Sequence, residues 1–355
     1  MKLTSDAFRE LVQREGVVDD VDVSGADLNG MDLRGAVLNA VDLSGCHIER
    51  TDLRDAVLNG CCLMSAVLQQ TQLQGISLVG CDLSRVQGDG ADLQKSILNE
   101  CNLDESSLLG AELGSAILHC CSLRGTVMKG AGLQCTMFAD CNFDKTDLSH
   151  CELDRTVLLG ADLRNARLEG TSFKCVQLMG AKLAAQSFAG RSLRLTQFAD
   201  ADLSGCDFCN ADIRQANFQG ALLADARFIG AQADATIFLG AKLARADFSK
   251  ARLRNAIFVE AQLAYAVLRA ADCYQAIFHR AEASHCVFAD AELTYADFMH
   301  ARLTDADFRG ATLFRAKLHG TNTEGAAFTD RARAMEDDPD LLTAERWQPT
   351  PVRWN

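Results

Sequence analysis

Proline is scarce in this 355-residue chain: only Pro339, Pro349 and Pro351 occur, all close to the C-terminus. No stretch approaches the roughly 18 consecutive apolar residues that a membrane-spanning helix needs, so we expect no membrane span. The first ten residues contain no apolar signal-peptide core. We therefore expect a cytoplasmic protein or, if it is exported, secretion without a signal peptide.

Motifs of common catalytic sites are also missing. The sequence contains no phosphate-binding glycine loop, nucleophile elbow, zinc-finger spacing or metalloprotease motif. We expect no enzyme activity, no cofactor and no metal site. The net charge of −13 argues against direct nucleic-acid binding, and −11 of it falls in residues 1–180. Fifteen cysteines in a long chain without an export signal indicate a reducing compartment.

A repeat of five residues dominates the rest of the sequence. Every fifth residue from Leu28 to Leu318 is Leu, Ile, Met or Phe, apart from Gly88, Ala233, Cys273 and Ala283. We call this position the centre. A small residue usually lies two positions before it, and glycine often follows two positions after it. A period of five fits neither a helix nor a simple strand, so it predicts a chain that turns a corner every five residues.

The centres from Phe188 onward carry a second period. Phenylalanine and leucine alternate there, so phenylalanine recurs about every ten residues. In a coil with four sides, ten residues are half a turn. The alternation therefore predicts ladders of phenylalanine on two opposite sides. We interpret the change from leucine to phenylalanine centres as two packing regimes of one solenoid.

The motif Ala-Asp-Leu at 26–28, 91–93, 161–163 and 201–203 resembles the repeat of the pentapeptide-repeat family. The resemblance implies an all-β fold, a right-handed quadrilateral β-helix of about 15 coils. It covers residues 21–328. We expect a helical cap over residues 1–20, with a helix at 5–15, and a helical tail over 329–355, with helices at 330–335 and 339–347 whose two tryptophans pack over the last coil.

An outward-facing row of apolar residues is the main candidate for a binding site. These residues directly precede a centre and recur every 20 residues on one side, the apolar side. The candidate partner-binding residues are Val37, Val57, Ile97, Ile117, Met137, Val157, Ile237, Ile257 and Ile277. Such rows also suit strand formation alone. We nevertheless expect a protein partner to dock here, with a homodimer through this side or the C-terminal tail as an alternative.

The neighbouring side carries acids at the equivalent position, and we call it the acidic side: Asp32, Asp52, Asp92, Glu112, Glu152, Asp212, Asp272 and Glu292. Arg34 and Arg54 are placed to offset its first carboxylates. Cys61, Cys81, Cys101, Cys121 and Cys141 recur at one inward position, where we expect small buried hydrophobes. His279, His300 and His319 recur near one corner and are interpreted as solvated, although a metal ion could bridge two of them.

These observations predict a non-enzymatic interaction scaffold, a rigid rod that docks a partner along the apolar side. The resemblance implies two alternatives. Some pentapeptide-repeat proteins mimic B-form DNA and bind DNA gyrase, although the long chain and the fading acidity here depart from that pattern. Other members accompany bacterial type VI secretion as accessory or effector proteins.

Overall fold

The computed structural model describes residues 2–345 and 347, which form two compact units. Unit 1 comprises the described residues up to Ala184 together with Ser192–Asp202, and unit 2 comprises Ala185–Arg191 and the described residues from Leu203 onward. Each unit is a stack of 20-residue turns joined by parallel pairing. The predicted fold class is confirmed, because the chain forms a parallel β-solenoid of about 16 turns with a short helix at each end. The boundaries of the repeat at residues 21 and 328 stay predictions.

Backbone hydrogen bonds explain why the sequence repeats. The N–H of a centre donates to the carbonyl one turn ahead, as from Leu28 to His47 at 2.7 Å. At each corner, the N–H of the small residue donates back to the preceding centre, as from Ala26 to Val23 at 3.0 Å. The residue two positions after the centre then has a left-handed backbone, with φ 66° at Gly30. Glycine is common there because other residues strain in that conformation.

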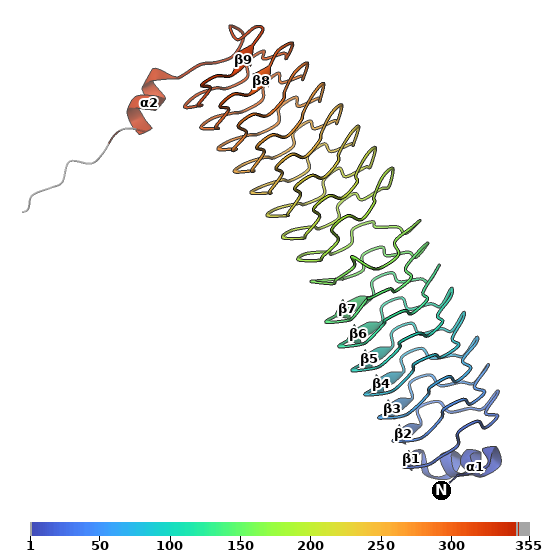
Figure 1. The fold of residues 1–355 in the computed structure, drawn as a ribbon. Coiled ribbons are helices and arrows are strands. Elements are labelled where there is room, and N and C mark those ends of the chain that lie inside the picture. Colours follow the sequence, from blue (N-terminus) through green and yellow to red (C-terminus); the bar gives the residue numbers. More distant parts are fainter. Residues whose placement is uncertain (1, 346, 348–355) are drawn as a thin grey trace, which may run out of the picture. The chain divides into compact units, whose positions relative to one another are not determined.

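Unit 1 begins with helix α1 (Ser5–Glu15), which Thr4 caps at its start and Gly16 at its end. Phe8 and Val12 are the buried residues of this helix, as the sequence predicts for a cap over the first turn. A seven-stranded parallel sheet follows on one side of the coil (Figure 1). Its strands are β1 (Val17–Asp19), β2 (Val37–Asn39), β3 (Val57–Asn59), β4 (Ser77–Val79), β5 (Ile97–Asn99), β6 (Ile117–His119) and β7 (Met137–Ala139).

The interior of unit 1 is filled by the centres and the small residues. Leucine centres such as Leu118 are completely buried. Small polar residues are also buried, because Thr51 Oγ1 donates to the Leu28 carbonyl at 2.8 Å and later threonines repeat this bond. Gly88 leaves an apolar cavity of about 20 Å³ beside Leu108. A cavity of that size holds about one water molecule, so the cavity offers no room for a larger ligand.

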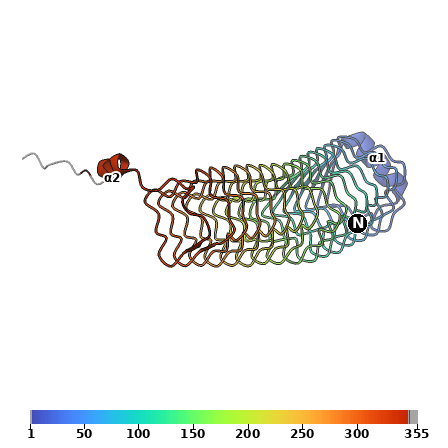
Figure 2. The same ribbon diagram turned by 90° about the horizontal axis from the view of Figure 1, so that it is seen from above.

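Unit 2 is filled mainly by phenylalanine. Successive rings stack between turns, as Phe228 does on Phe248 with centroids 4.5 Å apart. Rings from opposite sides meet edge to face, as Phe238 and Phe248 do at 5.5 Å and 83°. These contacts confirm the two predicted ladders. Strands β8 (Asp307–Phe308) and β9 (Ala327–Phe328) pair near the end of the unit, and Figure 2 shows its turns stacked on one another.

The tail differs from the prediction in two places. Residues 331–335 form a turn and a bridge instead of a helix, because the Met335 N–H donates to the Ala316 carbonyl at 2.7 Å and extends the last turn. The next helix, α2 (Pro339–Glu345), starts as predicted after the capping side chain of Asp338. Trp347 is 70% exposed, so the predicted packing over the last coil is wrong for this residue. Trp354 lies outside the described residues.

Two weak spots in the pattern are tolerated without a change of register. Gln186 and Arg191 occupy the inward small position, yet both are only half-buried. The coil therefore turns these long side chains partly toward solvent. This is expected because burying the amide of Gln186 or the charge of Arg191 would cost free energy. No described helix combines the length and the apolar character needed to cross a membrane.

Candidate functional site

The apolar side of unit 1 is the outer face of the sheet β1–β7. Val37 pairs with Val57, Ile97 with Ile117, and Ile117 with Met137, all in register. Ile97, Ile117 and Met137 are 48%, 40% and 43% exposed. Val37, Val57 and Val157 are half-buried. The structure therefore brings the first six candidate residues into one row, and β5–β7 present its most exposed part.

The end of the same sheet adds polar and apolar neighbours. Asn59 Nδ2 donates to Asn39 Oδ1 at 2.8 Å, and Asn39 in turn donates to Asp19, which forms an amide ladder along β1–β3. Val79 and Leu159 continue the exposed apolar surface beyond the central row. The ladder ties the ends of β1–β3 together through side-chain bonds that add to the backbone bonds of the sheet.

The apolar side of unit 2 is formed by Ile237, Ile257 and Ile277, which pair with one another as isolated bridges. Ile277 is exposed, and the other two are half-buried. An open groove begins beside Ile277 and is lined by Tyr295 and Met335 together with Asp297, Arg315 and Lys317. The exposed apolar surface is smaller here than in unit 1, and charged groups interrupt it.

Arginine neutralises much of the acidic side. Arg54 binds Asp52 through two hydrogen bonds of 2.9 and 2.6 Å, and Arg34 does the same with Asp32. The Arg34 guanidinium lowers the pKa of Asp32 to about 2. Arg214 and Arg254 pair with Asp212 and Asp272 in unit 2. The predicted offset by Arg34 and Arg54 is confirmed, and these carboxylates are partly satisfied within the chain.

The cysteine row behaves like the threonines at the same position. Cys61 and Cys81 donate from Sγ to the carbonyls of Leu38 and Leu58, each at 3.3 Å. Cys101, Cys121 and Cys141 repeat the bond one turn later each time. Burial raises the pKa of the Cys151 thiol, at an equivalent inward position, to about 11. These contacts fit the interpretation of small inward side chains that bond to the backbone.

One exposed corner of unit 1 combines groups found in catalytic and metal sites. Cys120 Sγ lies 3.5 Å from His119 Nε2, and His119 Nδ1 lies 2.7 Å from Asn99 Oδ1. Asp140 is 3.9 Å from the same imidazole. Partial desolvation and the carboxylates of Asp140 and Glu100 raise the pKa of the Cys120 thiol. A nucleophilic cysteine needs the opposite shift, so this corner is poorly suited to catalysis.

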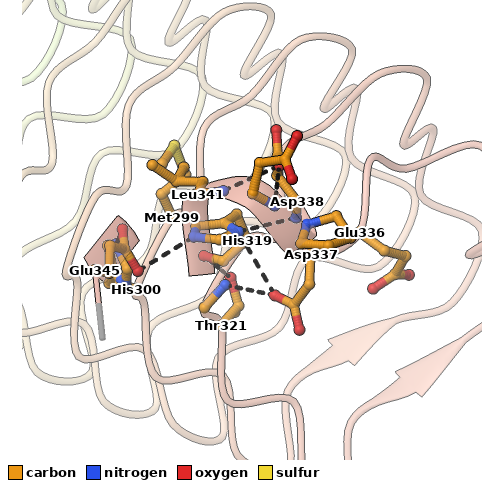
Figure 3. Close-up of polar contacts among 12 residues, drawn as sticks. Met299, His300, His319, Thr321, Glu336, Asp337, Asp338, Leu341 and Glu345 are labelled. Carbon is orange, nitrogen blue, oxygen red and sulfur yellow. Dashed lines mark hydrogen bonds and ion pairs between the residues drawn. The ribbon is translucent and has the colours of Figure 1, made fainter. Parts of the chain in front are cut away.

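A second cluster lies where the tail meets the last turns of unit 2. His300 and His319 both contact the carboxylate of Glu345, at the end of α2 (Figure 3). His319 is 4% exposed, although the sequence interpretation placed it in solvent. That interpretation is wrong for His319 because the tail covers it. His279 is half-buried and neighbours His300, with the two ring centroids 5.6 Å apart.

Comparison with known families identifies the repeat. The model described as pentapeptide repeats matches in several segments, some of them overlapping, from residues 19–55 through 138–174 to 291–330, and the matched segments span most of the chain. The chain belongs to the pentapeptide-repeat family. No curated protein matches it.

Three solved structures match this chain at low sequence identity. HetL, which is involved in heterocyst differentiation regulation in the cyanobacterium Nostoc, is 22% identical; the match covers 89% of this chain and 96% of HetL, with a TM-score of 0.24. QnrB1, a plasmid-mediated fluoroquinolone resistance protein, is 18% identical over 64% of this chain and 97% of its own, with a TM-score of 0.29. Rfr23 from the cyanobacterium Cyanothece is 21% identical over 40% of this chain and 94% of its own, with a TM-score of 0.17.

The sequence did not reveal an aromatic and arginine cluster on the pentapeptide-repeat coil of unit 2. Tyr295 meets Tyr274 at 5.8 Å and Phe314 at 5.9 Å, both edge to face. Arg254 lies over the Tyr274 ring at 5.8 Å and Arg315 over the Phe314 ring at 6.0 Å. Tyrosine and arginine are common in the centres of protein interfaces. Their recurrence at about 20-residue spacing was the signal that could have found them.

Proposed function

We propose that the chain is a non-enzymatic scaffold that docks a protein partner on the apolar side of unit 1. Pentapeptide-repeat solenoids are typically structural or interaction scaffolds. The observation that carries the proposal is the row Ile97, Ile117 and Met137, which are exposed on three consecutive strands of a rigid sheet. Apolar patches on an outer face of this kind commonly mark sites of protein interaction.

Charge defines the partner further. Glu100 and Asp140 lie at corners next to the apolar row, and residues 1–180 carry −11 of the net charge. A partner surface with apolar residues flanked by lysine or arginine would match both features. A second copy of the chain fits less well, because two such acidic surfaces would repel each other. The partner that we propose is therefore a protein with a basic rim around an apolar patch.

The test compares two variants with the same change in charge. The first replaces Ile97, Ile117 and Met137 by lysine and should lose the partner. The control replaces Asn102, Ser122 and Asn142 by lysine, which are the equivalent outward residues of the next side on the same turns. Surface substitutions change the free energy of unfolding by about 0.5 kcal/mol each. The control costs more, because Asn102 and Ser122 are half-buried and their side chains bond to Asp82 and Asp104. Circular dichroism therefore has to show both variants folded before partners are captured.

The wild type, the control and the first variant are each used to capture partners from a bacterial lysate. A protein captured by the wild type and the control but not by the first variant is identified and purified, and its affinity for each form is measured by titration. The proposal expects at least about a tenfold weaker affinity for the first variant alone. Light scattering on the isolated chain reports self-association. A captured protein that binds all three forms equally would refute docking on this side, and a dimer that only the first variant loses would replace the partner by a second copy.

DNA mimicry is a second candidate, favoured by the concentration of acidic residues in residues 1–180. The arginine pairs on the acidic side oppose it, because they neutralise carboxylates that would have to imitate phosphates. A supercoiling assay with DNA gyrase tests it directly. Inhibition or protection that weakens with added salt would support mimicry, and no response at low salt and excess protein would remove it. The link to type VI secretion stays a prediction.

A further inference from the structure

Three residues that could each offer one ligand atom to a metal ion lie together at the end of unit 2: His300, His319 and Glu345. His300 Nε2 lies 3.1 Å from Glu345 Oε1, and His319 Nε2 lies 3.3 Å from Glu345 Oε2 (Figure 3). One ligand atom from each residue lies within 4.8 Å of the other two. Zinc binds imidazole nitrogen and carboxylate oxygen at about 2.0–2.2 Å, so the corners of its tetrahedron are about 3.3 Å apart. We propose that these three residues bind Zn²⁺ or a similar divalent transition metal.

The surroundings hold the two imidazoles in place. The side chain of His319 is 5% exposed, and that of His300 is 30% exposed. His300 lies against Gly320, where an added Cβ would collide with its ring nitrogen Nδ1. Gly320 therefore leaves the space that the ring of His300 occupies. A cluster enclosed in this way loses less side-chain freedom on binding an ion than ligands on an open surface.

An outer carboxylate is placed to support His319 as a ligand. His319 Nδ1 accepts a hydrogen bond from the Asp338 N–H at 3.1 Å, which leaves the ring proton on Nε2. Metal binding needs the lone pair of Nε2, so the ring proton must move to Nδ1 and the Asp338 N–H must give up its bond to that nitrogen. Asp337 Oδ1 is 3.8 Å from Nδ1 and is itself fixed by the Gly320 N–H at 2.8 Å. Ligating histidines commonly donate their second N–H to such a carboxylate.

The row continues one turn back with His279. Its buried Nε2 has no hydrogen-bond partner within the described part of the chain, and its ring neighbours His300. Three protein ligands leave one coordination position for water or for a further ligand. Because Glu345 belongs to α2 and the histidines belong to the coil, a bound ion would fasten the tail helix to the last turns.

The experiment titrates Zn²⁺ into the full chain and follows binding by native mass spectrometry. Co²⁺ provides a second probe, since cysteine ligands add a thiolate absorption band that a site of two histidines and a glutamate lacks. The variants are Glu345→Ala, Asp337→Asn and the matched control His285→Asn, a histidine that stacks on Tyr265 instead. Cys120→Ser removes the competing exposed corner of His119, Cys120 and Asp140.

We expect Glu345→Ala to weaken one zinc-binding event by at least about tenfold and Asp337→Asn to weaken it by about 10–100-fold, with no change for His285→Asn. Zn²⁺ should also slow hydrogen exchange in α2 of the wild type but not of Glu345→Ala. The proposal is overturned if the chain binds no zinc, or if all bound zinc disappears with Cys120→Ser. Circular dichroism checks that each variant is folded. We expect Glu345→Ala to fold normally, because Glu345 is partly exposed at the end of a helix.

Discussion

Phe238 lies in the middle of an aromatic ladder in unit 2, and its replacement tests how that interior is held together. The ring stacks on Phe218 at 5.2 Å and on Phe258 at 4.8 Å. It also meets Phe228 and Phe248 edge to face at 5.8 and 5.5 Å. Phe238 is completely buried. Replacing a buried phenylalanine by alanine costs about 3–5 kcal/mol, because burial is lost and a cavity remains.

Phe238→Leu separates ring contacts from volume. Ordinary swaps between large apolar residues cost less than about 1.5 kcal/mol. Each aromatic pair contributes about 0.5–1.5 kcal/mol beyond burial, and Phe238 takes part in four such pairs. At the lower end of that range the four pairs together contribute about 2 kcal/mol, so we expect Phe238→Leu to lower the free energy of unfolding by at least about 2 kcal/mol.

The measurement is urea unfolding combined with native-state hydrogen exchange of the surrounding amides. In a solenoid each turn is stabilised by its neighbours, so protection should fall first in the turns next to Phe238. Leu243→Ala in the same unit is the comparison for loss of burial without ring contacts. If Phe238→Leu is as stable as the wild type, the stacked rings add nothing beyond their volume and the reasoning fails.

Three further predictions concern other parts of the coil. Gly88→Ala should raise the free energy of unfolding, measured by urea unfolding, by about 0.4–1 kcal/mol, because alanine leaves the unfolded chain less entropy to lose. The new Cβ would lie 3.0 Å from Leu108 Cδ2, which must move into the adjoining cavity; a loss of stability would show that this neighbour cannot move. Cys101→Thr should change the melting temperature little, since threonine repeats the bond to the carbonyl, whereas Cys101→Leu should cost about 1–3 kcal/mol by overpacking. The Arg309 guanidinium lowers the pKa of Asp307 to about 2, below the unfolded value of about 3.9, so their pairing stabilises the fold above about pH 4 and is lost as pH falls toward 2; the stability difference between the wild type and Arg309→Gln should shrink over that interval, and a constant difference would contradict the pairing.

The repeating part of the fold could be predicted from the sequence because each level of structure carries the same period. The centres fixed which residues face inward, and the alternation of phenylalanine and leucine fixed the two ladders around Phe238. The type of the residue directly before each centre, apolar or acidic, distinguished the apolar side from the acidic side. These features depend on neighbours 5 or 20 residues apart, and that spacing can be read directly from the chain.

The tail and the clusters could not be predicted in the same way. Met335 completes a turn by bonding to Ala316, although the segment around it has no five-residue pattern. His319 is buried because Asp338 and Glu345 reach it from the tail. Such contacts depend on the path of a non-repeating segment. The exposed corner of His119 and Cys120 needed side-chain directions that the period alone does not supply.

The measurement that tests partner docking most directly is the affinity of an identified partner for Ile117→Ala. Ile117 lies between Ile97 and Met137 in the exposed row, so it would be a central anchor of the interface. Truncating a central apolar anchor typically costs more than about 1 kcal/mol, which weakens binding about fivefold or more. Ser122→Ala, on the next side of the same turn, should leave the affinity unchanged. Equal affinities for the wild type and both variants would contradict docking on the apolar side.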